Sequence, residues 1–412
     1  MAEWIDCKIS DIGTVVSGAT PSTKKAENYE GGAIAWITPK DLSTFSGRYI
    51  KKGERNITEL GLKSCSTQLL PKDTVLFSSR APIGYVAIAA NEVCTNQGFK
   101  SVIPNENTDP LFLYYLLKYN KDRIESLGSG TTFKEVSGNT MKNIEVRVPK
   151  DKEVQSRIAS IIGSIDDKIE ENERINNNLE QQARLLFDSL FTTTGSTIES
   201  DFGFIPSSFS LTKVGQIPMI ITDYVANGSF ASLKENVTLY QEQNYAYFIR
   251  NTDLKADSFG VFVDKHSYDF LSKSTLYGGE IIISNVGDVG SVFLCPKLDQ
   301  PMTLGNNIIM LRPENDELRF YLYIWFKYAF GQAIIQGIKG GSAQPKFNKT
   351  DFKNTNIAIP CEVMLHSFHQ TVSPMFDMII ANKSESKRLS DLRDSLLPRL
   401  ISGEIDVSNV QI

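Results

Sequence analysis

A run of apolar residues at heptad spacing, in the middle of the 412-residue chain, limits its fold most strongly. From Ile158 to Leu190 the apolar positions follow one another by alternating steps of four and three, which is the a/d spacing of a coiled coil. An amphipathic helix on a domain surface is the alternative, but more than four successive heptads favour a partner helix. The seam positions are Ile158, Ile162, Ile165, Ile169, Asn172, Asn176, Leu179, Ala183, Leu186 and Leu190.

A second segment with the same spacing lies near the C-terminus, each position 210 residues after its counterpart. We therefore predict that the two helices pair with each other. In an antiparallel pair, Asn172 would lie near Ser386 and Asn176 near Asn382, as one polar layer that fixes the register. The spacing alone leaves parallel pairing open. The second set of positions is Phe368, Val372, Met375, Ile379, Asn382, Ser386, Leu389, Arg393, Leu396 and Leu400.

The two helices belong to a larger internal repeat. The segment "WITPKDL" (36–42) matches "FIRNTDL" (248–254), and "DTVLFSSRAPIGYV" (73–86) matches "GEIIISNVGDVGSV" (279–292). The segment "GSGTTFKEVSGNTMKNIEVRVP" (128–149) matches "GGSAQPKFNKTDFKNTNIAIP" (340–360). Because strand, glycine turn, Gly/Ser loop, strand and long helix recur in the same order, the chain is interpreted as a tandem duplication.

The expected fold class is α+β, with two β-rich domains separated by two long helices. The expected boundaries are residues 1–150 for the first domain, 151–195 for the central helix, 196–361 for the second domain and 362–412 for the C-terminal helix. Short strands are predicted around 34–38, 74–78, 85–90, 99–103 and 144–148. One helix of about 15 residues is predicted from "DPLFLYYLLKYNKDRIESL", because Asp109 and Pro110 make a good helix start.

Composition is that of a cytoplasmic protein with two packed cores. Hydrophobic residues make up 41% of the chain, yet no run of 18 apolar residues occurs and the N-terminus is not a signal peptide. The five cysteines are scattered singly, which indicates reduced thiols rather than disulfides or zinc ligands. The net charge of −5 is uneven, because residues 1–150 carry +3 and residues 151–195 carry −4. DNA contact would therefore depend on local basic clusters.

The sequence lacks the motifs of the common catalytic sites. It contains no P-loop, no Gly-x-Gly-x-x-Gly after a strand, no His-Glu-x-x-His and no Gly-x-Ser-x-Gly. The three histidines, His266, His366 and His369, are too few and too dispersed for a metal site or a triad. We therefore expect no catalytic residue, no metal site and no cofactor in this chain.

Basic and polar loops form the remaining candidate site. Lysine, serine, threonine and backbone amides contact phosphates, whereas arginine and asparagine contact base edges. The loop "GSGTTFKEVS" combines glycine amides with Thr131, Thr132 and Lys134. Any one of these residues could instead lie in a solvated turn, but the Gly/Ser loop beside lysine occurs in both halves. The candidate DNA-binding residues are Lys24, Lys25, Lys40, Arg80, Lys134, Lys142, Arg250, Asn251, Asn285, Lys339, Lys346 and Lys349.

These motifs, in this order, resemble those of the specificity subunit of type I restriction–modification systems. The likeness covers nearly the whole chain and includes "SGATPSTKKAENYEGGAIAWITPKDL", "VLFSSRAPIGYVAI", "IASIIGSIDDKIEENERINNNLEQQARLLFDSLF" and "LRDSLLPRLISGEIDV". The resemblance implies two target recognition domains, each reading one half of a bipartite asymmetric DNA site, and an antiparallel coiled coil that spaces them. The second half departs from the pattern, since Asn285 and Val286 stand where Ser79 and Arg80 stand.

The resemblance also implies partners. Two methylation subunits would dock on the chain and motor–nuclease subunits would join for restriction, and these would bind S-adenosylmethionine, ATP and magnesium. Two other interpretations remain at this point. The chain could be the recognition subunit of another restriction enzyme class, or a coiled-coil scaffold that does not bind DNA.

Overall fold

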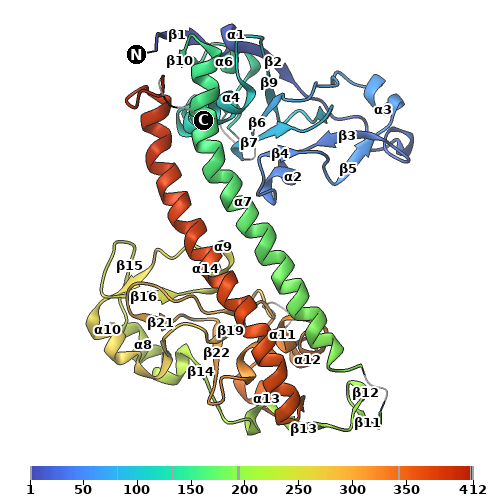
Figure 1. The fold of residues 1–412 in the computed structure, drawn as a ribbon, viewed down its shortest axis with the longest axis vertical. Coiled ribbons are helices and arrows are strands. Elements are labelled where there is room, and N and C mark those ends of the chain that lie inside the picture. Colours follow the sequence, from blue (N-terminus) through green and yellow to red (C-terminus); the bar gives the residue numbers. More distant parts are fainter. Residues whose placement is uncertain are drawn as a thin grey trace. The chain divides into compact units, whose positions relative to one another are not determined.

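The computed structural model describes residues 2–80, 82–130, 134–192, 195–341, 344–408 and 410. The chain divides into two compact units. Unit 1 comprises Met1–Arg174 together with Lys383–Ile412, and unit 2 comprises Ile175–Asn382. Each unit is α+β and contains part of both long helices, α7 (Lys152–Ser189) and α14 (Glu362–Ile401) (Figure 1).

Three sheets form the globular part of unit 1. A five-stranded sheet has the order β2-β9-β6-β7-β4, a three-stranded sheet has the order β5-β3-β8, and β1 pairs with β10. The strands are β1 (Trp4–Lys8), β2 (Gly13–Ser17), β3 (Ile34–Ile37), β4 (Tyr49–Ile50), β5 (Arg55–Ile57), β6 (Val75–Ser79), β7 (Ile83–Ala89), β8 (Cys94–Thr95), β9 (Lys100–Pro104) and β10 (Glu145–Pro149). The five strands predicted from the sequence correspond to β3, β6, β7, β9 and β10.

The short α-helices described beside these sheets are α1 (Ile9–Ile12), α2 (Pro39–Ser43), α3 (Glu59–Lys63), α4 (Pro110–Tyr119), α5 (Lys121–Ser126) and α6 (Gly138–Lys142). The single helix predicted after Asp109 is wrong in one respect, because it is divided into α4 and α5. Asn120 ends α4 and its side chain donates to the Leu116 carbonyl, 2.8 Å away. The predicted start is confirmed, since the Asp109 carboxylate accepts the backbone N–H of Phe112 at 2.8 Å.

Unit 2 repeats this plan with longer insertions. Its strands are β11 (Thr197–Ser200), β12 (Gly203–Pro206), β13 (Phe209–Lys213), β14 (Met219–Asp223), β15 (Leu239–Tyr240), β16 (Ala246–Ile249), β17 (Phe262–Val263), β18 (Thr275–Leu276), β19 (Ile281–Ser284), β20 (Val292–Leu294), β21 (Met302–Leu304), β22 (Ile308–Pro313) and β23 (Asn356–Pro360). Its helices include α8 (Phe230–Asn236), α9 (Asn251–Ala256), α10 (Lys265–Phe270), α11 (Leu318–Lys327), α12 (Ala329–Ile338) and α13 (Lys349–Asn354).

The strand orders confirm the internal duplication. The order β14-β22-β19-β20 matches β2-β9-β6-β7, and the pair β13-β23 matches β1-β10. In both units a central short strand, β3 or β16, is antiparallel to one neighbour and parallel to the other. Gly84 and Gly290 have matching positive φ values of 97° and 99° where the next strand begins. Such a backbone conformation favours glycine, so both repeats depend on it at this turn.

Within unit 1, α7 and α14 run antiparallel. The Asn172 amide donates to Ser386 at 3.2 Å and to Glu385 at 2.8 Å, and Arg393 donates to Asp166 at 2.8 Å. Ile158 and Ile162 are fully buried in one core with residues of α4 and the end of α14, including Phe112 and Leu400. The N-terminal part of α7 is therefore an integral part of the unit 1 core.

Within unit 2, the two helices are antiparallel as well. The Asn382 amide donates to Asn176 at 2.9 Å, and the rings of Phe187 and Phe368 lie 6.3 Å apart. Asn172 with Ser386, and Asn176 with Asn382, are the neighbours expected for antiparallel pairing. The half-buried seam positions are Ile165, Ile169, Asn176, Leu179, Leu186, Leu190, Met375, Ile379, Asn382, Ser386, Leu389, Arg393 and Leu396.

Among the described residues, no helix has both the length and the apolar character that a membrane span would need. The five cysteines are free thiols in the structure.

Candidate nucleic-acid interface

Four loops of unit 1 meet where several of its strands end. The backbone N–H of Ser79, at the end of β6, donates to Gly98 at 2.7 Å, and that of Val136 donates to Ser79 at 3.0 Å. The N–H of Ala19, after β2, donates to Thr95 at 3.0 Å. These bonds bring together residues 18–25, 79–80, 95–98 and 134–137, which we call the first loop cluster.

Arg80 lies at the centre of the first loop cluster. One carboxylate, Glu135, lies 3.7 Å from the Arg80 guanidinium and 3.2 Å from the Lys100 ammonium. Lys100 is almost fully buried, whereas the Arg80 side chain is 35% exposed. Because Glu135 lies closer to Lys100 than to Arg80, the exposed part of the Arg80 guanidinium can donate to an incoming acceptor. A guanidinium held in this way suits the acceptor edge of guanine or a phosphate.

Of the other predicted residues of unit 1, some lie in the first loop cluster and others lie outside it. Lys24, Lys25 and Lys134 are exposed in the first loop cluster, with Lys25 3.8 Å from Glu27. Lys40 lies in α2 and pairs with Glu54 at 2.8 Å. Lys142 ends α6 and lies apart from the cluster. The residue after it, Asn143, accepts a hydrogen bond from Lys8 of β1. Thr131 and Thr132 lie outside the described residues.

Three polar residues of this cluster were not predicted from the sequence. The Thr20 hydroxyl donates to the Gln97 side chain, and the Asn96 side chain accepts the backbone N–H of Gly98 at 2.9 Å. Amide side chains suit the edge of adenine. The run "TNQG" (95–98) was the available signal, because it follows a buried strand and precedes another.

Unit 2 has an equivalent arrangement, built by equivalent backbone hydrogen bonds. Asn285 donates its N–H to Asn307 at 3.1 Å, as Ser79 does to Gly98, and Phe347 donates to Asn285 at 3.0 Å, as Val136 does to Ser79. Gly305 donates to Ile249 at 2.8 Å, as Asn96 does to Ile37. We call residues 250–251, 285–290, 305–307 and 339–347, without the undescribed 342–343, the second loop cluster.

The two clusters differ in charge at matching places. Single β-bridges join Arg80 to Glu135 in unit 1 and Val286 to Lys346 in unit 2. Val286 therefore stands at the place of Arg80, and an exposed lysine stands at the place of Glu135. The second cluster also contains a carboxylate, that of Asp288. It lies 2.6 Å from Lys255 and accepts a hydrogen bond from the Ser291 hydroxyl at 2.5 Å. The hydrogen bonds from Lys255 and Ser291 lower the pKa of Asp288, so it stays ionised.

The predicted residues of unit 2 surround this turn. Asn285 lies in it, and Lys346 bridges both Val286 and Gly340, beside Lys339. Arg250 is 38% exposed and pairs with Asp253 at 2.6 Å, at the start of α9 where Asn251 begins the helix. Lys349 pairs with Asp223 at 3.1 Å. Lys339 and Lys346 are thus the exposed cations of the second cluster, while Arg250 and Lys349 also stabilise local structure.

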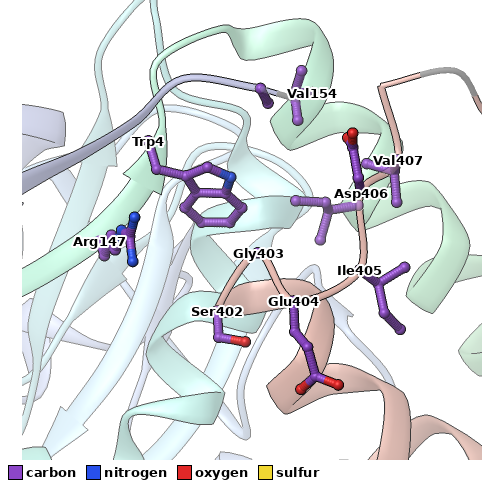
Figure 2. A pocket seen from close by; sticks show the side chains of 11 residues that line it. Trp4, Arg147, Val154, Ser402, Gly403, Glu404, Ile405, Asp406 and Val407 are labelled. Carbon is purple, nitrogen blue, oxygen red and sulfur yellow. The ribbon is translucent and has the colours of Figure 1, made fainter.

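A hollow of about 360 Å³ lies elsewhere in unit 1, between β1, β10 and the residues that follow α14 (Figure 2). The Trp4 ring covers the turn at Gly403, where φ is 79° and a Cβ would come within 2.6 Å of the ring. Glu404 pairs with Arg399 at 2.7 Å, and Asp406 accepts the Ser408 N–H at 3.0 Å. The Trp4 contact joins the C-terminal segment to the first strand, whereas the other two contacts stabilise the segment itself.

Two histidines of α14 contact the start of α11. His366 pairs with Glu317 at 2.6 Å, and the His369 ring stacks on Phe320 with the ring centres 5.9 Å apart. In the described part of the chain, no group of three or more His, Cys, Asp or Glu side chains could hold a metal ion.

Comparison with known proteins finds relatives that span the whole chain. The sequence model of the family described as "Type I restriction modification DNA specificity domain" matches residues 1–181 and again residues 196–362. The chain is 34% identical to the type I restriction enzyme MjaIX specificity subunit of Methanocaldococcus jannaschii, over 99% of this chain and 95% of that protein. It is 26% identical to the type I restriction enzyme HindI specificity subunit of Haemophilus influenzae, over 98% of this chain and 100% of that protein.

The fold is also found among solved structures. The S subunit of the type I restriction–modification system from M. genitalium superimposes with a TM-score of 0.60 at 18% sequence identity, over 97% of this chain and 96% of that one. At this identity the likeness establishes the architecture, and it extends across both units.

Proposed function

Because the chain belongs to the family of type I restriction–modification DNA specificity subunits, we propose that its two loop clusters each read one half of a bipartite DNA site. The chain is the DNA sequence-recognition subunit of such a system. The observation that carries the proposal is the repeated loop cluster, assembled by the same backbone hydrogen bonds at the ends of the same strands in each unit. Two similar frames that hold different side chains are suited to reading two different half-sites.

The side chains at matching places support an asymmetric site. Arg80 in the first cluster offers paired donors to a base edge or a phosphate, whereas the second cluster places Asn285, Lys346 and Asp288 around its turn. Arginine suits guanine, asparagine suits adenine and a carboxylate suits the amino group of cytosine. The exposed lysines around both clusters supply phosphate contacts.

The long helices connect the two reading units and set their spacing. Both helices extend from unit 1 into unit 2, and in each unit they pair antiparallel across a polar layer. Such a layer opposes a shift of register, because a slipped asparagine would face an apolar partner. The gap, meaning the unspecified base pairs between the two half-sites, then follows from the length of the paired helices.

The chemistry of the complex belongs to other subunits. The chain works with further restriction–modification subunits and DNA. We assign it two methylation subunits and motor–nuclease subunits, which bind S-adenosylmethionine, ATP and magnesium. The assignment is supported by a sequence without the common nucleotide-binding and catalytic motifs. We place the chain in the cytoplasm, where the assembled subunits bind the cellular DNA.

A map of the methylated bases tests the function. In cells that carry this chain and its methylation subunit, we expect one motif in two unlike parts with a fixed gap. Cells that carry either subunit alone serve as the control and should show no methylation at the motif. A continuous or palindromic motif would contradict the assignment of one half-site to each unit.

Replacing Lys24, Lys25 and Lys134 together by alanine should weaken binding of the assembled complex to its DNA site. Each lost phosphate contact lowers the magnitude of the log–log salt slope by roughly 0.9, so the slope should fall by up to about 3. The measurement is the DNA dissociation constant across a series of salt concentrations. The control replaces Lys8, Lys150 and Lys152, which surround the β1–β10 sheet. If the log–log salt slope were the same in both triple variants, the three loop lysines would be ordinary solvated surface residues that do not contact phosphates.

A further inference from the structure

Arg48 makes an unusual connection between the recognition domain and a long helix within unit 1. It lies just before β4, and its backbone carbonyl accepts the N–H of Ile88 in β7 at 2.7 Å. Its side chain is only 5% exposed and reaches α7, where Nε donates to Glu170 at 2.9 Å and Nη2 pairs with Asp167. A third donor, Nη1, lies 3.3 Å from the Gly163 carbonyl. One guanidinium thus contacts three positions on a single face of the helix.

The helix is shaped to receive this side chain. Gly163 lies inside α7, where glycine is less favourable than alanine. A Cβ at this position would come within 3.3 Å of Arg48 Nη1 and 3.2 Å of a Leu111 methyl group. The glycine is therefore explained by close approach. Burial by itself lowers the pKa of Arg48, but the hydrogen bonds to Glu170 and Asp167 outweigh it and leave this pKa raised.

A second buried contact joins the same domain to both helices. The Tyr115 hydroxyl of α4 donates to Asp166 at 2.7 Å, and Arg393 of α14 donates to the other oxygen of that carboxylate at 2.8 Å. Asp166 and Asp167 are neighbours on α7, yet they face different partners. Contacts on two faces of one helix oppose rotation of the domain around the helix axis.

The connection leads directly to the first loop cluster. Ile88 belongs to β7, which pairs with β6 along its length, and the two strands are joined by the turn that contains Arg80. A turn of the domain about α7 would therefore move the Arg80 turn together with β6 and β7. Arg48 itself is buried and occupied by carboxylates, so it is not available to DNA.

We propose that Arg48, held by Asp167 and Glu170, is a positioning residue that fixes the angle of the first loop cluster on the helix and thereby the length of the gap. The inference rests on the proposed function of the chain as the reader of a bipartite site. A buried cation that loses its partners is destabilised, so the domain adopts additional angles when the pair is broken. The bases read in each half are unaffected, because each loop cluster keeps its own hydrogen bonds.

The test compares two adjacent carboxylates of α7. Glu170→Gln removes the charge that holds Arg48, whereas Glu171→Gln removes one that pairs with Arg174 on its own helix at 2.6 Å. The variants Asp167→Asn/Glu170→Gln and Arg48→Lys extend the series, and each is assembled with the methylation subunit. The methylated sites and their gaps are then mapped, and the thermal midpoint of each complex is measured.

We expect the double variant to methylate the parental half-sites at gaps one base pair longer or shorter. The preference for the parental gap should fall by about tenfold, corresponding to the loss of roughly one charged hydrogen bond. Arg48→Lys should lie between this variant and the parent, because a lysine lacks the forked geometry. Glu171→Gln should keep the parental gap.

A lower thermal midpoint with an unchanged gap preference would overturn the inference, because Arg48 would then only stabilise the unit. If Arg48→Lys or the double variant does not accumulate, the comparison of Glu170→Gln with Glu171→Gln replaces it. A changed gap preference in Glu170→Gln alone would support the inference, and a lower thermal midpoint without that change would overturn it. Failure of the proposed function would be recognised separately, since the parental complex itself would then give no bipartite motif.

Discussion

Lengthening α7 and α14 by one heptad each should lengthen the gap in the recognised site and leave the bases of both half-sites unchanged. The insertions go after Arg174 in α7, at the junction of the two units, and after Lys383 in α14, one residue from that junction. There they leave the Asn172–Ser386 pair inside unit 1 and the Asn176–Asn382 pair inside unit 2. A whole heptad keeps the a/d seam continuous, so the helices still pair.

The expected increase follows from helix geometry. Seven residues add about 10 Å of helix, which equals about three base pairs of DNA. Three base pairs also rotate one half-site relative to the other by about 100°. If the complex resists this rotation, the gap will lengthen by fewer than three base pairs. Mapping the methylated sites gives the new gap directly.

A single insertion provides the control for this experiment. The same heptad in α7 alone leaves the two helices unequal, and we expect methylation to be lost rather than moved to a new gap. A double insertion that keeps the parental gap at full activity would show that the helices do not set the spacing.

Exchanging the first recognition domain for that of another family member should replace one half-site entirely and preserve the other half-site and the gap. The exchange covers residues 1–150, and the donor needs an arginine at the position of Arg48 and apolar residues that fit around Ile158 and Ile162. The second loop cluster is unchanged, because all of its backbone hydrogen bonds lie within unit 2.

The reciprocal exchange is the matched control. Replacing residues 196–361 should change only the other half-site, again read from the methylated bases. If either exchange altered both half-sites, the two units would not be independent readers.

The sequence predicted the features that repeat. The a/d seam indicated two paired helices, and the similarity of residues 73–86 to 279–292 indicated two copies of one domain, because both signals extend over many residues. In unit 1 the strands β1, β2 and β5 were missed, as were β4 and β8, which have two residues each. Such strands have no periodic signal, since their hydrogen-bonding neighbours alone determine them. The division at Asn120 was missed because a helical pattern of apolar residues continues through it.

The individual site residues were harder to predict. Arg48 and Glu170 are 122 residues apart, and a single arginine in a polar loop gives no sign of its burial. Gly163 inside a predicted helix was the available signal for a close contact there. Glu135 and Lys100 were missed for the same reason, because their association with Arg80 depends on how three separate loops meet.

The C-terminal segment also determines when unit 1 can be completed during synthesis. Unit 2 is one continuous stretch, Ile175–Asn382, so all of its residues are available before the ribosome reaches the second half of α14. The core of unit 1 needs Leu397, Leu400 and Val407, which are made some 250 residues after α7 begins. This core of unit 1 can therefore be completed only after all of unit 2 has been made, the reverse of the usual order in which the N-terminal domain is completed first. A chain that stops early lacks Leu397 and Leu400 from the core around Ile158 and Ile162, and apolar surface exposed in this way directs a protein to chaperones and proteases. The core of unit 1, which carries the first loop cluster, is therefore complete only when synthesis has passed Val407.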